Sequence, residues 1–278
     1  MPADRRNPDA RSGTPRSARL LRVGRSKSGG VVGAGEPPRV RVLLFDVFGT
    51  CVDWRGGIAR AGENVARRCG ITSIDWLAFA DGWRRRYQPQ LETVRSGARD
   101  WVELDVLHRE SLDELLDAQR LDLGEQERVE LTLAWHALDP WPDTVEGLRR
   151  LGARHVRAAC SNGHRALVMS LMRHGALPFD AVLGAETARA YKPRPEVYLR
   201  SVAALGVGPA EAMMVAAHNS DLRAAAACGL KTAFIARPYE WGPGQSEDLR
   251  ADPSVDVVAG DLIDLAERLD DWHTSLDR

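Results

Sequence analysis

The sequence has few cysteines, no long apolar run and almost no excess of charge of either sign. Its four cysteines include no Cys-x-x-Cys pair and no matching histidine spacing, which argues against a zinc site or a disulfide framework. The longest apolar runs, such as Ala212 to Ala217, are far shorter than the roughly 20 residues that a membrane-spanning helix needs. We therefore exclude an integral membrane protein and expect a cytoplasmic protein with reduced, mostly buried thiols.

The overall composition is that of a globular chain of the size of an enzyme. Of its 278 residues, 44% are hydrophobic and 28% are charged, and the formal net charge is −1. A chain of this length can bury a substantial core. It predicts either one large domain or one domain with an inserted second lobe.

The first 39 residues differ from the rest of the chain. They carry nine Lys or Arg against three acidic residues, so their net charge is +6 and that of the remainder is −7. They are rich in Ser, Gly and Pro and have no apolar face that could offset the entropy of folding. We expect residues 1–39 to form a disordered basic extension without a secretory signal, a specific nucleic-acid partner or a membrane partner.

Short apolar and β-branched runs alternate with helical patterns over much of the chain. Strands that alternate with helices indicate a parallel sheet covered on both faces. The sequence therefore predicts an α/β fold, a Rossmann-like doubly wound parallel sheet. The expected strands are 40–45, 155–160, 181–184, 212–217, 231–235 and 255–258, and the expected helices are 143–153, 165–174, 196–205, 222–228 and a last one to 269.

The segment from about residue 58 to 138 has helical periodicity and no convincing strand. Pro89 is expected to kink or stop the second of its four helices. Because this segment directly follows the first strand, it predicts a helical cap domain inserted into the core. We expect the core domain at 40–56 and 140–270 and the cap domain at 57–139.

Polar side chains follow several of the predicted strands, where the site of an open α/β sheet is expected. Asp46 comes directly after four apolar residues. An Asx turn is the ordinary explanation for such a residue. A lysine nearby would instead keep this carboxylate ionised, and an ionised, desolvated carboxylate is a competent nucleophile. The polar groups at the strand ends are Asp46 with Thr50, Ser161-Asn162-Gly163, Lys192, and His218-Asn219-Ser220-Asp221.

These groups, in this order, resemble the four motifs of the haloacid dehalogenase superfamily, which match from Val40 to about Leu269. The resemblance implies that Asp46 is the nucleophile and that Thr50 belongs to its motif. Ser161, Lys192 and Asp221 match the second, third and fourth motifs. Each motif alone is weak, but four in order around a helical insertion are specific.

Two positions depart from the phosphatases of that superfamily. Phosphatases carry a second Asp two residues after the nucleophile, where this sequence has Phe48, and a metal-binding carboxylate where Ala217 stands. Magnesium needs oxygen ligands and carries the charge in phosphoryl transfer, whereas a halide leaves as a stable anion. The departures favour dehalogenation with no metal or organic cofactor over a magnesium-dependent phosphatase or phosphonatase.

The finer pattern is similar to the L-2-haloacid dehalogenase (type II) branch. The resemblance implies that Asp46 displaces halide from a short 2-haloalkanoic acid and forms an ester, which water hydrolyses to a 2-hydroxy acid. It also implies a homodimer. The matching segments are Asp46 to Thr50, Ser161 to Gly163, Lys192-Pro193 with Val197-Tyr198, and Trp83-Arg84.

The same resemblance implies roles around the nucleophile. Lys192, hydrogen-bonded to Tyr198, would anchor Asp46. Arg84 would face the departing halide, although from sequence alone a solvated position beside Arg85 and Arg86 is the simpler interpretation. Tyr198 could equally be a core residue. The remaining substrate-binding candidates are Ser161 with the following amide of Asn162, which would bind the substrate carboxylate, and Val47 and Phe48.

The fourth motif differs from the best-known form of the branch, because His218 stands at an asparagine position and Ala216 at a serine position. A histidine with a pKa near neutrality can activate water, and so can Asp221, so the choice between them stays open. Asn219 is a further catalytic candidate, although it and His218 could instead cap the helix expected near Leu222. The other histidines have no ligand spacing and stay unassigned: His108, His136, His155, His164, His174 and His273.

A protein of another class remains as an alternative. It is a non-catalytic relative that binds a ligand or a partner and uses the basic extension as a docking arm.

Overall fold

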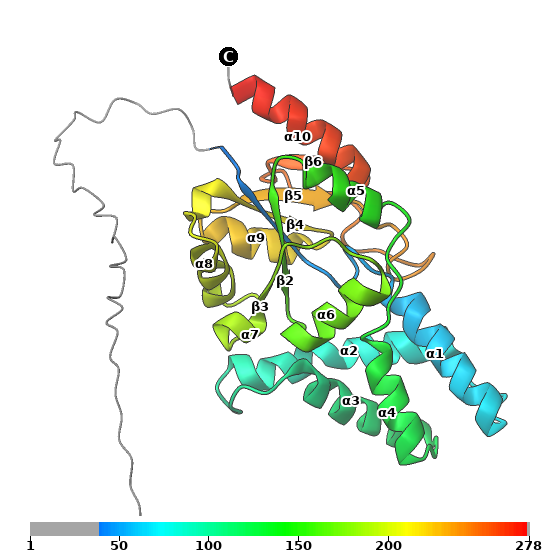
Figure 1. Ribbon diagram of the computed structural model, residues 1–278. Helices are drawn as coiled ribbons and strands as arrows, with labels where there is room; N and C mark the ends of the chain where they lie inside the picture. Colours follow the sequence, from blue (N-terminus) through cyan, green and yellow to red (C-terminus); the bar gives the residue numbers. More distant parts are fainter. Residues whose placement is uncertain (1–38, 277–278) are drawn as a thin grey trace, which may run out of the picture. The chain divides into compact units, whose positions relative to one another are not determined.

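The computed structural model describes residues 39–276, so the predicted extension, apart from Arg39, lies outside the described residues. Its centre is a six-stranded sheet in the order β3-β2-β1-β4-β5-β6, and every neighbouring pair is parallel (Figure 1). All six predicted strands are confirmed, with small shifts at their ends. They are β1 (Val42–Phe45), β2 (Val156–Ser161), β3 (Ala181–Gly184), β4 (Ala212–Ala216), β5 (Lys231–Ile235) and β6 (Val257–Ala259).

Both faces of the sheet are covered, as the doubly wound prediction requires. Successive side chains of a strand point to opposite faces, so Leu43 and Phe45 belong to one apolar core and Val42 and Leu44 to the other. The first core includes α5 (Thr144–Leu151), α6 (Arg165–His174) and α10 (Leu262–Leu276). The second includes α8 (Pro195–Ala204) and α9 (Asn219–Ala227).

Two short elements were not predicted. They are α7 (Ala185–Ala188) and a 3₁₀ turn (Pro209–Glu211), which are too short to show a hydrophobic period.

Four helices lie between β1 and α5 and pack on one another (Figure 1). We call them the helical lobe: α1 (Trp54–Cys69), α2 (Trp76–Arg95), α3 (Leu104–Gln119) and α4 (Glu125–Ala134). Side chains fix the start of two of them, because Asp53 accepts from Gly56 N at 2.8 Å and Asp75 from Ala78 N at 3.0 Å. The first helix begins before the predicted boundary at residue 57, and the division into core and cap domains stays a prediction.

Helix α2 continues through Pro89 to Arg95, so the expectation that Pro89 stops the helix is wrong. A proline inside a helix costs about 3 kcal/mol, because it removes one hydrogen bond and crowds the preceding turn. The buried side chains on either side of it, Tyr87 and Leu91, anchor both halves of the helix to the apolar core. No helix of the part of the chain described here is both long and apolar enough to cross a membrane.

A buried ion pair holds the turn that follows β1. Arg237 donates from both terminal nitrogens to the two carboxylate oxygens of Asp143, each at 2.7 Å, and from Nε to the carbonyl oxygen of Thr50 at 3.0 Å. Leu262 N donates to the same carboxylate at 2.9 Å. This pair therefore links the start of α5, the start of α10, the segment after β5 and the turn that carries Thr50.

We expect the Asp143→Ala variant to lower the free energy of unfolding by about 3–5 kcal/mol, because it leaves the Arg237 charge buried without a partner. Urea denaturation followed by circular dichroism measures this loss. Glu130→Ala removes one partner of the exposed Arg68–Glu130 pair and is the control, with an expected loss below about 1 kcal/mol. Equal losses in the two variants would contradict the bracing role of Asp143.

Candidate active site

A cavity of about 460 Å³ lies at the carboxyl ends of the central strands, under helix α2. Its wall combines residues that follow β1, β2 and β4 with residues of the helical lobe. This is the position where open α/β sheets bind ligands. Eight residues predicted from the sequence line it: Asp46, Phe48, Arg84, Asn162, Lys192, Tyr198, His218 and Asp221.

Asp46 is held by hydrogen bonds on both carboxylate oxygens. Lys192 Nζ donates to Oδ1 at 2.8 Å, Thr50 Oγ1 donates to Oδ2 at 2.9 Å, and His218 Nδ1 lies 3.0 Å from Oδ2. Burial alone would raise the pKa of Asp46, but the charge of Lys192 and the hydrogen bond from His218 lower this pKa below its ordinary value. Asp46 is therefore ionised at neutral pH although it is almost fully buried.

Thr50 and Gly49 shape the turn that carries Asp46. The Thr50 hydroxyl donates to Asp46 and accepts from the backbone N of Ala217 at 2.9 Å, so it ties the turn after β1 to the turn after β4. Gly49 has a φ of +84°, and a Cβ atom there would lie 2.1 Å from Oε1 of Glu240. Only glycine fits this position, for both conformational and steric reasons.

Lys192 joins two carboxylates. Its Nζ donates to Asp46 at 2.8 Å and to Oδ2 of Asp221 at 2.5 Å, and Tyr198 donates its hydroxyl to Oδ1 of Asp221 at 2.5 Å. The expected hydrogen bond between Lys192 and Tyr198 is therefore wrong, because both groups act as donors to the same acceptor, Asp221. Tyr198 is a buried residue of the apolar core, yet its hydroxyl belongs to the site.

The charges of this group follow from the same contacts. Burial alone would lower the pKa of Lys192, but the nearby Asp221 and Asp46 charges raise it above its ordinary value, so the ammonium stays protonated. Burial raises the pKa of Asp221, and the Asp46 charge adds to this effect. Of the two carboxylates, Asp46 is thus the one kept most firmly ionised.

His218 contacts a carboxylate through each ring nitrogen. Nδ1 faces Asp46, and Nε2 lies 2.9 Å from Oε2 of Glu240, which is 1% exposed and also accepts from Trp54 Nε1 at 2.8 Å. Burial alone would lower the pKa of His218, but the charge of Glu240 and the hydrogen bond with Asp46 raise it well above its ordinary value. His218 is therefore an imidazolium that donates from both nitrogens.

Glu240 is absent from the residues that the sequence predicts. It lies five positions after the end of β5 and belongs to none of the four motifs. The strand-end rule, applied to β5 as it was to the other strands, would have pointed to this acidic residue.

The helical lobe supplies positive charge to the cavity. The Arg84 guanidinium lies 4.1 Å from the ring centroid of Tyr87 and 5.4 Å from that of Trp54, and its buried Nη1 has no hydrogen-bond partner within residues 39–276. Arg95, which also lines the cavity, donates to the carbonyl oxygen of Lys192 at 2.9 Å. Arg84 thus lies on the cavity wall and not on a solvated face of α2.

Two of the other predicted site residues, Ser161 and Val47, hold the surrounding turns and do not line the cavity. Ser161 Oγ accepts from Gly163 N at 2.9 Å, and the carbonyl oxygen of Val47 accepts from Cys51 N at 2.9 Å. Asn162, on the cavity wall, accepts from the backbone N of Lys192 at 2.8 Å. A direct contact of Ser161 or Val47 with substrate stays a prediction.

Asn219 holds the loop after β5. Its backbone N and its Nδ2 both donate to Oδ1 of Asp248 at 2.9 Å, and its Oδ1 accepts from Asp252 N at 2.8 Å. A catalytic role for Asn219 stays a prediction. The alternative, that His218 and Asn219 cap a helix near Leu222, is confirmed only for the position of His218, which is the N-cap residue of α9. Its side chain makes no capping bond within the described chain, and Asn219 is already the first residue of the helix.

A magnesium ion does not fit beside Asp46. Oδ1 of Asp46 and Oδ2 of Asp221 both accept from the Lys192 ammonium, and Oδ2 of Asp46 faces the His218 imidazolium. Ala217, directly after β4, offers no oxygen from its side chain. Magnesium needs several oxygen ligands and would be repelled by the two fixed cations.

A model of the haloacid dehalogenase-like hydrolases matches residues 40–229. The chain belongs to this family. Among curated proteins, this hydrolase is 29% identical over 202 residues to the (S)-2-haloacid dehalogenase of Xanthobacter autotrophicus. The aligned region covers 71% of this chain and 76% of the relative. Phosphoglycolate phosphatases also match it, but less well.

Solved structures of L-2-haloacid dehalogenases resemble the hydrolase over most of its length. A defluorinating enzyme of this kind is 47% identical, with a TM-score of 0.81 over 83% of this chain and 95% of the other. A second is 46% identical, with a TM-score of 0.81 over 84% of this chain and 99% of the other. The resemblance to the L-2-haloacid dehalogenase branch is therefore confirmed.

Proposed function

We propose that this hydrolase cleaves the carbon–halogen bond of short L-2-haloalkanoic acids and releases 2-hydroxy acids. The observation that carries the proposal is the setting of Asp46, an ionised carboxylate at a cavity whose wall also holds Lys192 and Arg84. Phe48 occupies the position where a phosphatase needs a proton donor. The site thus supports displacement of an anion that leaves without a proton.

In the first step, a carboxylate oxygen of Asp46 attacks C2 of the substrate from the side opposite the halogen. A carbon–oxygen bond forms while the carbon–halogen bond breaks, and the halide leaves with the bonding electrons. Arg84 supports this step, because its Nη1, which has no hydrogen-bond partner among the described residues, can donate to the departing halide. Donors placed where charge develops stabilise the transition state more than the bound substrate.

In the second step, water attacks the Asp46 carbonyl carbon of the ester, and the bond between this carbon and the substrate oxygen then breaks. The substrate oxygen takes one proton of the water and leaves in the 2-hydroxy acid, Asp46 keeps the water oxygen, and the other proton passes to His218. Esterification removes one of the two charges that raise the pKa of His218, so its Nδ1 proton passes to solvent. Nδ1 can then accept the proton of the attacking water while Glu240 holds the Nε2 proton. This arrangement is like the pairing of histidine with a buried carboxylate in hydrolytic triads, where the carboxylate fixes the tautomer.

We assign the water-activating role to His218 and a positioning role to Asp221. Both oxygens of Asp221 already accept short hydrogen bonds, one from Tyr198 and one from Lys192. A carboxylate whose two oxygens are both occupied in this way is poorly placed to accept a proton from water. His218, in contrast, loses its partner at Nδ1 when Asp46 becomes an ester.

The helical lobe is proposed to act as the cap domain, with Arg84 closing the cavity over the substrate. A cytoplasmic location is part of the proposal and is supported by the four free cysteines. The homodimer rests on the family resemblance alone, and light scattering during size-exclusion chromatography tests it.

The proposal predicts halide release from chloroacetate and L-2-chloropropionate that is unchanged by excess EDTA, with little release from D-2-chloropropionate. An ion-selective electrode or ion chromatography measures the halide. Fluoroacetate is included because fluoride requires the strongest stabilisation of the leaving anion. Magnesium-dependent phosphate release from phosphate monoesters without halide release would overturn the proposal, and binding of a haloacid without turnover would favour the non-catalytic alternative.

A further inference from the structure

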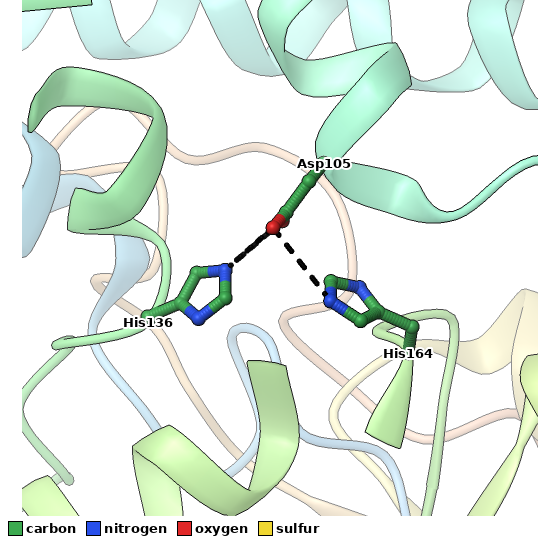
Figure 2. Close-up of side chains that lie close together, drawn as sticks. All are labelled: Asp105, His136 and His164. Carbon is green, nitrogen blue, oxygen red and sulfur yellow. Dashed lines mark hydrogen bonds and ion pairs between the residues drawn. The ribbon is translucent and has the colours of Figure 1, made fainter. Parts of the chain in front are cut away.

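Two histidines and an aspartate from separate segments meet outside the cavity (Figure 2). Asp105 lies in the first turn of α3, His136 just after α4, and His164 directly before α6. His136 Nε2 lies 2.8 Å from Oδ2 of Asp105, and His164 Nε2 lies 3.6 Å from the same oxygen. One ligand atom from each of the three residues lies within 4.8 Å of the others.

His164 lacks the hydrogen bonds that a buried imidazole normally makes. The residue is 4% exposed, and its buried Nδ1 has no hydrogen-bond partner among residues 39–276. Its Nε2 points at the Asp105 carboxylate from a distance longer than a hydrogen bond (Figure 2). Buried polar groups are normally paired, and Nε2 makes no hydrogen bond to the carboxylate that it faces, so an ion between the two would give this nitrogen a partner.

The donor set has the chemistry of a zinc site. Two imidazole nitrogens and one carboxylate oxygen are a common three-residue set for zinc, with a fourth position open to water or another ligand. Glu103 is placed to fill that position, since its Oε2 lies 3.9 Å from His164 Nε2. Ligand atoms around zinc lie roughly 3.3 Å apart, so small rotations of the two rings would bring them to bonding distance.

We propose that Asp105, His136 and His164 bind a zinc ion that links the helical lobe to the sheet. Asp105 belongs to the lobe and His136 lies two residues after its last helix, whereas His164 belongs to the turn after β2 that also carries Asn162 of the cavity wall. The ion has a structural role, restricting movement of the lobe relative to that turn. The inference does not depend on dehalogenation, because Asp46 takes no part in it.

Zinc titration of the EDTA-treated full chain tests the proposal. Isothermal titration calorimetry is expected to give one zinc per chain, and the melting temperature is expected to rise by several degrees with zinc. Cobalt(II) in its place is expected to show the intense visible absorption of a tetrahedral site. His136→Gln and Asp105→Asn are expected to weaken zinc binding by about 100-fold or more, since losing only an outer partner of a zinc ligand costs about 10- to 100-fold.

His174→Gln is the matched control and is expected to bind zinc like the parent. His174 also pairs with an aspartate, Nε2 lying 2.9 Å from Oδ1 of Asp139, but it has no second histidine among the described residues at this pair. Binding that is absent, or that is equal in all variants, would overturn the proposed site. Circular dichroism of the Gln and Asn variants separates lost binding from lost folding, and halide release with EDTA present reports on the proposed function separately.

Discussion

The Asp46→Asn variant is expected to lose halide release by a factor of about 10⁴ or more, the scale of losses seen when a catalytic nucleophile is removed. A carboxamide has the shape of the carboxylate but lacks the nucleophilic oxygen anion. Steady-state halide release from chloroacetate measures the loss, and circular dichroism checks that the variant is folded. Single-turnover hydrolysis in ¹⁸O-water is expected to place the label on Asp46 of the parent.

Asp256→Asn is the control for this experiment. Asp256 accepts from Lys231 at 3.0 Å and from Thr232 at the start of β5, far from the carboxyl ends of the strands. It is expected to keep parental halide release. Release by Asp46→Asn at the rate of this control, or a label found only on the product, would show that water attacks the substrate directly.

We expect the Glu240→Gln variant to accumulate the ester on Asp46. Glu240 is in contact with His218 and not with the substrate carbon in the proposed mechanism, so the first step is expected to be slowed less than the second. General-base catalysis contributes about 10²- to 10⁴-fold, which bounds the expected slowing of ester hydrolysis. Rapid-quench experiments are expected to show a burst of one halide per chain, followed by a slow phase.

Mass spectrometry of the peptide that contains Asp46 detects the ester directly. The pH dependence gives a second measurement, because Glu240 raises the pKa of His218 and its neutralisation lowers that pKa. The limb where ester hydrolysis accelerates with pH is therefore expected to move to lower pH. Glu211→Gln, at the opposite end of the sheet, is the control. Equal slowing of both steps without accumulated ester would contradict the proposed role of His218 and Glu240 in ester hydrolysis.

The fold could be predicted because its signals are local. Each strand is a short apolar run bounded by turn residues, and alternation with helices determines a parallel sheet. The strand-end rule then placed Asp46, Lys192 and His218 near one another before any contact was known. Tertiary packing decided what local signals could not, as in α2, where buried neighbours keep the helix intact through Pro89.

The partners within the site could not be predicted in the same way. Which acceptor Lys192 and Tyr198 share depends on where Asp221 lies, and that position is set by the packing of α8 against α9. Asp105 is 31 residues from His136, so no sequence spacing marks their contact. Contacts between distant segments are products of the whole fold, and a sequence pattern indicates only the residues that are available for them.

Each of the two cations beside Asp46 also contacts a second carboxylate. Lys192 is shared with Asp221, and His218 is shared with Glu240. An unpaired charge left in a buried site costs about 3–5 kcal/mol, which would oppose any reaction that neutralises its partner. In this arrangement the neutral ester of Asp46 leaves Lys192 paired with Asp221, while His218 gives up its Nδ1 proton and stays bonded to Glu240 through Nε2. The covalent intermediate is therefore expected to be electrostatically tolerated by the folded protein.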